Sequence, residues 1–160
     1  MGAGAPVGVE LRIEPADPGE PAVRELIAEL DAYLEALYPA ESNHLVPIDA
    51  LRAPGVVFVA ARLGARTVGC GAMVDRAGEY GELKRMYVRP ECRGSGVGGA
   101  ILQALTSQAR ALGLPALRLE TGIAQPQALG LYERAGFRRR APFGDYREDP
   151  LSFFMELRLD

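Results

Sequence analysis

A glycine-rich run is the part of the chain whose residue types point most directly to chemistry. The run comprises Arg93, Gly94, Ser95, Gly96, Val97, Gly98 and Gly99 and is preceded by an apolar segment that ends at Val88. Glycines let the backbone take unusual φ values and approach a ligand closely. If a helix follows, its first turn presents unpaired N–H groups and the positive end of its dipole. A strand, glycine loop and helix together predict a cradle for a pyrophosphate.

Two other interpretations of these glycines remain open. A glycine cluster can be no more than a flexible turn. Gly94, Gly96 and Gly99 also satisfy the dinucleotide-binding pattern, and Glu120 ends a predicted strand roughly 20 residues later. In that fold, however, the glycines follow their strand almost directly, whereas residues 89–93 intervene here. Too few residues follow Glu120 to complete a doubly wound sheet, so this interpretation is disfavoured.

The elements that must position this run follow from the hydrophobic periodicity. Alternation and short apolar runs predict strands at 7–13, 56–61, 67–74, 79–88, 117–120, from 137 onward and at 151–159. Spacing of three to four residues predicts helices at 18–38, 97–112 and 126–136, with a short helix near 48–52. The order predicts an α/β chain of the mixed-sheet α+β type, with antiparallel strands first and one βαβ crossover later.

Local signals refine two of these elements. The stretch Asp17-Pro18-Gly19-Glu20 resembles a capping box with proline at the first helical position, so the first long helix should begin there. Tyr38, which precedes a proline, should end it. Gly69 and Gly71 weaken the strand at 67–74 and mark either a bulge or a close approach of a ligand.

Length and composition narrow the class of protein. A chain of 160 residues with 48% hydrophobic content fits one domain over 1–160, with residues 1–6 as a flexible tail. The net charge of −3 argues against a nucleic-acid-binding surface. No apolar stretch reaches the ~20 residues that cross a bilayer, and the start does not read as a signal peptide. Cys70, Cys92 and a single histidine, His44, suit neither a disulfide scaffold nor a metal site, so a cytoplasmic protein without metal is expected.

Three segments together resemble the GNAT family of N-acetyltransferases. Arg93-x-x-Gly96-x-Gly98 matches the family signature, the segment 83–90 looks like the strand before it, and 129–137 looks like the family's later helix end. The resemblance implies an acyl-CoA N-acyltransferase fold, with a central, mostly antiparallel sheet of six to seven strands flanked by helices. It also implies that acetyl-CoA is the cosubstrate and that a primary amine attacks it directly in a ternary complex.

The resemblance assigns the cofactor site. The backbone of the strand before the loop should pair with the pantetheine arm, the loop should hold the pyrophosphate, and the strand should splay from its neighbour to leave a cleft. Gln125 stands where the family often has an asparagine that touches the cofactor. The expected cofactor-binding residues are Met86, Tyr87, Val88, Arg93, Gly94, Ser95, Gly96, Val97, Gly98, Gly99 and Gln125.

Catalytic roles follow from the same resemblance. An alkyl amine with a pKa near ~10 attacks only when neutral, so a base is useful. Glu82 is the implied base, and its alternative is a solvated carboxylate paired with Lys84 or a neighbouring arginine. Glu82, Lys84, Met86 and Val88 should share one face of their strand unless a bulge intervenes.

Two further roles complete the implied reaction. The backbone N–H of Val88 is the implied donor to the tetrahedral oxyanion. Tyr132 is the implied acid that protonates the leaving thiolate, and its alternative is a core tyrosine on an amphipathic helix.

The acceptor and the assembly are left open by the sequence. Asp145 and Tyr146 lie between the last two predicted strands and could attract a cationic amine, although ordinary turn chemistry also explains them and is favoured. The alternatives to a small-molecule N-acetyltransferase are an acyl-CoA-binding sensor without efficient catalysis and a protein or peptide N-acetyltransferase. Dimers are common in families like this, so a homodimer is one expected assembly.

Overall fold

The computed structural model describes residues 9–159. Its centre is a single seven-stranded sheet. The strands are β1 (Leu11–Pro15), β2 (Val56–Leu63), β3 (Arg66–Arg76), β4 (Tyr80–Val88), β5 (Ala116–Gly122), β6 (Arg138–Arg140) and β7 (Ser152–Arg158). Their spatial order is β1-β2-β3-β4-β5-β7-β6, and every neighbouring pair is antiparallel except β4 and β5. The predicted mostly antiparallel sheet is confirmed, and a doubly wound parallel sheet is excluded. The expected tail, residues 1–6, lies outside the described residues.

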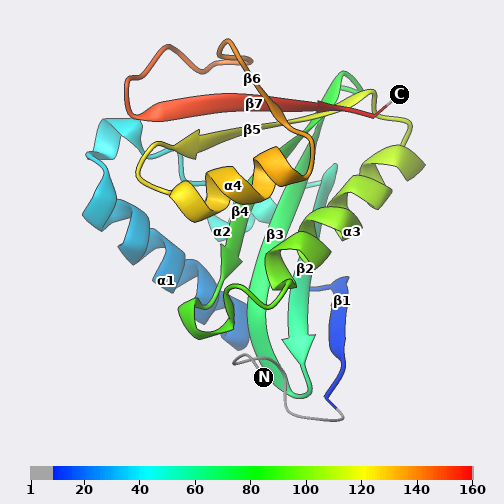
Figure 1. Cartoon of the computed structure of the whole chain (residues 1–160). Helices are drawn as coiled ribbons and strands as arrows, with labels where there is room; N and C mark the ends of the chain where they lie inside the picture. The colour runs from blue at the N-terminus through cyan, green and yellow to red at the C-terminus, as the bar shows by residue number, and fades with distance from the viewer. Residues whose placement is uncertain (1–8, 160) are drawn as a thin grey trace.

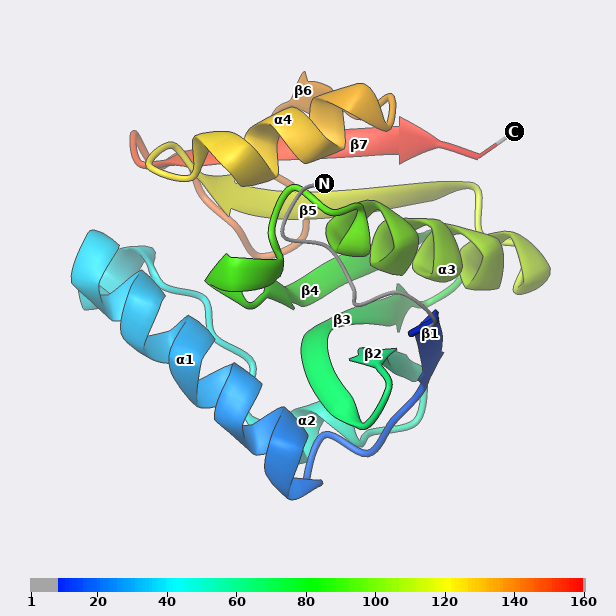
Figure 2. The ribbon, with the colours of Figure 1, turned by 60° about the horizontal axis from the view of Figure 1, so that its bottom comes forward.

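Helices cover both faces of the sheet (Figures 1 and 2). They are α1 (Pro21–Leu37), α2 (Ile48–Leu51), α3 (Val97–Ala111) and α4 (Pro126–Arg134), with single 3-10 turns η1 (Ala40–Ser42) and η2 (Pro90–Cys92). The first two α-helices lie on one side of the sheet, and the last two lie on the other (Figure 2). Between residues 9 and 159, no helix is both long and apolar enough to cross a membrane.

The strand β2 shows how the two core layers form. Phe58 and Ala60 pack with Leu26 of α1 in the α1-side core, whereas Val59 and Ala61 pack with α3 residues in the α3-side core. Because both faces of β2 are buried, its sequence is a continuous apolar run rather than an alternating one. The same arrangement anchors α3, which places the glycine-rich run at its N-terminal end.

The start of α1 differs from the prediction. The stretch Asp17–Glu20 forms a turn, in which the Glu20 N–H donates to the Asp17 carbonyl at 3.0 Å. The Asp17 carboxylate accepts from the Gly19 N–H and pairs with Arg52, so it does not cap the helix. The predicted capping box is therefore wrong, because Asp-Pro-Gly favours a turn and Pro21 supplies a later first position for the helix. Tyr38 does end α1, as predicted.

A β-bulge interrupts β4 and changes which side chains share a face. Cys70 pairs with Tyr87 and Ala72 pairs with Lys84, so β4 contains one residue more than β3 between these two pairs. Arg85 takes a positive φ of 56° there. Tyr87 consequently packs in the α1-side core, while Met86 and Val88 pack against the α3-side core.

The bulge corrects one expectation and explains one glycine. Glu82 and Lys84 lie on the α1 side of β4, so the predicted common face with Met86 and Val88 is broken. Gly71 of β3 lies opposite the bulge, and a Cβ there would lie 2.6 Å from Met86 Sδ and 2.8 Å from Ile101 Cγ2. The glycine therefore makes room for β4 and α3 rather than for a ligand.

Substitution of Gly71 should test this packing directly. Gly71→Ala should lower the free energy of unfolding by about 1–3 kcal/mol, because the new methyl group overpacks the contact with Ile101. Gly99→Ala is the matched control, since a Cβ at that helical position meets no atom within 4 Å. It should be neutral or stabilising by up to about 1 kcal/mol. Urea unfolding of both variants measures the difference, and equal effects would contradict the packing argument.

Candidate active site

The strands β4 and β5 separate soon after they meet. Their parallel ladder contains only the pairs Gly81–Leu117 and Glu82–Arg118. From Leu83 onward, β4 has no strand neighbour on this edge among the described residues. The predicted splaying of this strand is confirmed.

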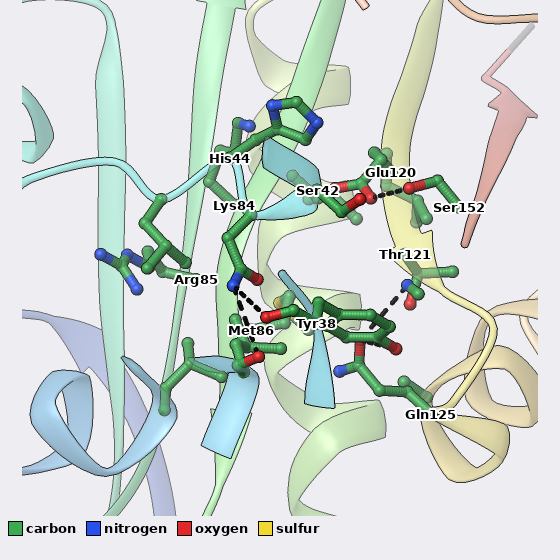
Figure 3. A pocket seen from close by; sticks show the side chains of 18 of the residues that line it. Tyr38, Ser42, His44, Lys84, Arg85, Met86, Glu120, Thr121, Gln125 and Ser152 are labelled. Carbon is green, nitrogen blue, oxygen red and sulfur yellow. Dashed lines mark hydrogen bonds between the residues drawn. The ribbon is translucent and has the colours of Figure 1, made fainter. Parts of the chain in front are cut away.

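A cleft occupies the space between the separated strands (Figure 3). Its apolar part is formed by Leu30 and Leu34 of α1, Met86 of β4 and Ala128 of α4. Its polar part lies between two walls, with Lys84 and His44 on one side and Glu120 and Ser152 on the other. The cleft therefore has an apolar part and a polar part, and the polar part is called the chamber below.

The open edge of β4 carries backbone groups that face the cleft. The Arg89 N–H donates to the Val68 carbonyl of the neighbouring chain segment at 2.8 Å. In an antiparallel ladder, successive residues direct their N–H and C=O groups to opposite edges. Val88 therefore directs its backbone groups away from β3 and toward the side from which β5 has departed. Met86 lies next to the bulge at Arg85 and lines the cleft.

The glycine-rich run turns the chain from β4 into α3. Gly94 and Gly96 have φ values of 81° and 88°, which other residues rarely adopt. Gly96 is the N-cap of α3, so the N–H groups of the following three residues have no carbonyl partner one turn back. The Arg93 side chain donates to the Val88 carbonyl at 3.0 Å, and its guanidinium lies over the rings of Tyr33 and Tyr87. The loop thus combines free amides with a fixed cation.

Gln125, the expected cofactor contact, belongs to a hydrogen-bond network across the cleft. Its Oε1 accepts from the Gly122 N–H and from the Tyr38 hydroxyl, both at 3.2 Å. The Tyr38 hydroxyl in turn accepts from the Ala124 N–H at 3.1 Å. Because a backbone N–H can only donate, these bonds assign the oxygen of the Gln125 amide to this network. Its NH₂ group is therefore the part available to a ligand.

Glu120 of β5 is a half-buried carboxyl group on the wall of the cleft. It accepts a hydrogen bond of 2.7 Å from the Ser152 hydroxyl. Burial raises the pKa of Glu120 above its ordinary value, and the charge of Asp149 adds to this effect against the opposing influence of Ser152, His44 and Lys84. A carboxylate with a raised pKa takes up a proton more readily, which suits a general base.

Glu82, the predicted base, is placed differently. It is 3% exposed and is not among the residues that line the cleft. Its carboxylate accepts from the Tyr146 hydroxyl at 2.6 Å and pairs with Arg76 at 2.9 Å and Lys84 at 3.2 Å. Burial alone would raise the pKa of Glu82, but Lys84, Tyr146 and Arg76 together hold it below its ordinary value. The pairing with Lys84 agrees with the alternative of a solvated carboxylate, but Glu82 is buried rather than solvated, and the arginine beside it is Arg76.

Tyr132 of α4 lines the cleft, with 6% of its surface exposed. Its ring meets Phe137 edge to face, with centroids 5.6 Å apart. Burial raises the pKa of the Tyr132 hydroxyl, and the nearby charge of Glu120 raises it further. The hydroxyl therefore keeps its proton at neutral pH, so it can act as a donor in the cleft.

Two chain segments meet beside the polar chamber, which Ser42 and His44 line, and they are together called the roof. The Ser42 hydroxyl, after α1, donates to the Asp149 carboxylate of the β6–β7 connection at 2.7 Å. The His44 ring meets the edge of the Tyr146 ring, with centroids 5.0 Å apart. Of the two predicted acceptor residues, Tyr146 supports the wall through Glu82 and Lys84, whereas Asp145 is exposed and does not line the cleft.

Sequence reasoning did not identify Tyr38 and Glu120 as members of this site. Tyr38 was visible only as a helix end, and Glu120 only as the acidic residue of the disfavoured dinucleotide pattern. The available signal for Glu120 was its position at the C-terminal part of the strand after the crossover helix, where ligands bind in such units. Within residues 9–159, no group of three or more His, Cys, Asp or Glu side chains is placed to hold a metal ion.

Comparison with known proteins gives relatives of matching length. An IAA acetyltransferase of Azospirillum brasilense is 51% identical over 140 residues, which cover 87% of this chain and 92% of the relative. A crystal structure from Klebsiella pneumoniae, named for acyl-CoA N-acyltransferase activity, is 38% identical with a TM-score of 0.80 and covers 94% of this chain and 98% of its own.

More distant structures share the fold. The PaiA N-acetyltransferase of Thermoplasma acidophilum, solved in complex with coenzyme A, is 17% identical with a TM-score of 0.73, covering 93% of this chain and 99% of its own. The model of the acetyltransferase (GNAT) family matches residues 23–137 of this chain. The chain therefore belongs to the GNAT family of acetyltransferases, which are acyltransferase enzymes.

Proposed function

We propose that the protein transfers the acetyl group of acetyl-CoA to the primary amine of a small molecule, by direct attack in a ternary complex. The observation that carries the proposal is the cleft between β4 and β5. The chain of β4 continues past Met86, which lines the cleft, into the loop and the free amides of α3, and the polar part of the cleft has Glu120 opposite Lys84. Donor and acceptor can therefore meet inside one cavity.

The cofactor half of the proposal rests on three features of the chain. The first-turn amides of α3 suit a diphosphate, since they carry partial positive charge. The Val88 N–H points to the open edge of β4 and Met86 lines the cleft, so this stretch of backbone suits the amides of a pantetheine arm, as in strand addition. The NH₂ group of Gln125 is available from the opposite side. The coenzyme A complex of the Thermoplasma relative supports the same ligand class.

The acid–base steps are assigned to residues on the cleft wall. Glu120 takes a proton from the acceptor ammonium, directly or through water, and the neutral nitrogen attacks the thioester carbon. The Val88 N–H stabilises the oxyanion that forms. When the carbon–sulfur bond breaks, Tyr132 donates its proton to the departing thiolate, and the second proton that the nitrogen loses on becoming an amide returns to Tyr132 through water. Glu120 replaces Glu82 as the proposed base, because Glu82 is already bound by three partners.

The roof favours the proposal that the acceptor is a small molecule rather than a protein. The Ser42–Asp149 bond and the His44–Tyr146 contact join the two segments above the chamber. A protein substrate would need an open groove at this place. A sensor that binds acyl-CoA without turnover is the competing function, and only the enzyme releases free thiol when amines are supplied.

Replacement of Glu120 should remove most of the turnover. Glu120→Gln is expected to lower kcat by about 10²-fold or more near neutral pH, since a base contributes roughly 10²–10⁴-fold. Because the base must be ionised, kcat/KM of the wild type should fall as the pH drops through the raised pKa of Glu120. The pH profile of the variant should lack this decrease on the acid side. The thiol-release assay, run across pH, measures both effects.

Glu82→Gln is the matched control for this experiment. It removes a carboxylate that pairs with Arg76 and Lys84, so its main expected effect is a lower Tm. Its kcat should fall less than that of Glu120→Gln, and the decrease on the acid side of its pH profile should persist. The opposite ranking would return the role of base to Glu82.

Removal of the Tyr132 hydroxyl tests whether this residue protonates the leaving thiolate. Tyr132→Phe keeps the ring contact with Phe137 and should lower kcat by about 10²-fold or less, since a thiolate with a pKa near ~8.5 leaves readily. Rapid-quench measurements must first show that chemistry limits the rate. Unchanged turnover under that condition would contradict the assignment.

The Tyr38 hydroxyl should matter for cofactor binding. Tyr38→Phe frees Gln125 from one of its two fixed bonds, and the Kd for coenzyme A should rise roughly threefold to tenfold. Adenosine 3′,5′-bisphosphate, which lacks the pantetheine arm, should bind both proteins equally in calorimetry. If the Kd values of both ligands rose by the same factor, the loss of affinity would not come from the Gln125 contact.

A further inference from the structure

We propose that the acceptor amine also carries a carboxylate group, which the Lys84 ammonium binds on the β4 wall while the amino group reaches Glu120 on the β5 wall. The inference deepens the proposed function and rests on it for the location of the acceptor. It assigns Lys84 as a specificity-determining residue and names amino acids, in the broad sense of amines with an acid group, as the acceptor class.

The bulge in β4 is what brings Lys84 to this place. Because Arg85 takes the extra position, Lys84 and Arg85 both direct their side chains to the α1 side of the sheet. Arg85 is held by its surroundings, because its Nε and Nη2 groups donate to the Val46 carbonyl and its Nη1 group pairs with Asp31. Lys84 is therefore the cation of this pair that remains to meet a ligand in the chamber (Figure 3).

The Lys84 ammonium has hydrogen-bonding capacity to spare. Its side chain is 12% exposed, and its partners among the described residues are the Tyr146 hydroxyl and the Glu82 carboxylate. An ammonium has three N–H groups, so one is left for a ligand. In a site that is largely removed from water, a carboxylate is the partner that an ammonium binds most strongly.

The charges around Lys84 leave it incompletely neutralised. Glu82 is shared between Lys84 and Arg76, so two cations face one carboxylate. The other acid near the roof, Asp149, is bound by the Leu151 N–H and the Ser42 hydroxyl. Within residues 9–159, Lys84 thus shares the one carboxylate that it pairs with, and an anionic group of the acceptor would give it a second partner on the β4 wall.

The opposite wall suits the other end of the same molecule. Glu120 is bound to Ser152 through one oxygen, and its second oxygen has no partner among the hydrogen bonds of residues 9–159. When ionised, Glu120 attracts an ammonium, and it then accepts the proton that must leave before attack. A cleft with a cation on one wall and an acid on the other is complementary to a zwitterion.

Paired acceptors provide the direct test. Glycine, β-alanine and 4-aminobutyrate would each be compared with the corresponding carboxamide in the thiol-release assay, with rates corrected for the fraction of free amine. For at least one chain length, the acid should exceed its amide in kcat/KM by roughly tenfold to hundredfold, the usual effect of one charge-assisted hydrogen bond. Amides that equal or exceed all of their acids would overturn the proposal.

Three variants separate ligand binding from support of Glu82. Lys84→Met should bring the acid-to-amide ratio close to one, and Lys84→Arg should retain a preference for the acid. Arg76→Met removes the other cation of Glu82 without touching the cleft, so it should keep the preference. If Lys84→Met lowers acids and amides by the same factor, Lys84 only supports the wall and the proposal is wrong.

A binding measurement distinguishes failure of this inference from failure of the proposed function. Calorimetry of the coenzyme A-loaded protein would compare N-acetylglycine, N-acetyl-β-alanine and N-acetyl-4-aminobutyrate with their carboxamides. Binding of an acid that depends on Lys84, without thiol release from any amine, would support the carboxylate site and contradict acetyl transfer to amines. Thiol release without any preference for acids would support transfer and contradict the carboxylate site. Absence of both would contradict both.

Discussion

The separation of β4 from β5 is the constraint on which the rest of the site depends. The two strands share only the pairs Gly81–Leu117 and Glu82–Arg118, after which different partners hold them. Arg85 ties β4 to α1 through Asp31, whereas β5 is bound along its whole length by β7. Because each strand is more strongly bound to its outer neighbour, the edge between them stays open. The cleft is therefore a consequence of how the strands pair.

The same arrangement gives two glutamates on neighbouring strands opposite properties. Glu82 lies where the strands still pair, beneath Tyr146 and between Lys84 and Arg76, and these partners lower its pKa. Glu120 lies where the strands have separated, with Ser152 as its hydrogen-bond partner, and burial raises its pKa. Both groups lose water, so the partners decide the direction in which each pKa moves. This contrast separates a structural carboxylate from a candidate base.

Much of the fold could be predicted because its signals are local. Periodicity located the long helices and most strands, and the glycines at 94 and 96 predicted the turn before α3. Predictions that depended on competition between local signals were less secure. The Asp17–Glu20 stretch satisfied a capping box and also a turn, and the turn prevailed because Pro21 could begin the helix one turn later. Motifs marked the loop before α3 and Tyr132, and of these Tyr132 lies on the wall of the cleft.

By itself, the sequence determined the order of elements, the place of the glycine loop and the family resemblance. All of these depend on residues that are close together in the chain. The tertiary structure decided the bulge at Arg85, the placement of Glu120 rather than Glu82 on the cleft wall and the position of Tyr38 beside Gln125. Each of these depends on contacts between segments far apart in the sequence, such as Tyr38 with Gln125 and Glu82 with Tyr146. Such contacts have no local signature, because burial and charge pairing arise only when the chain has folded.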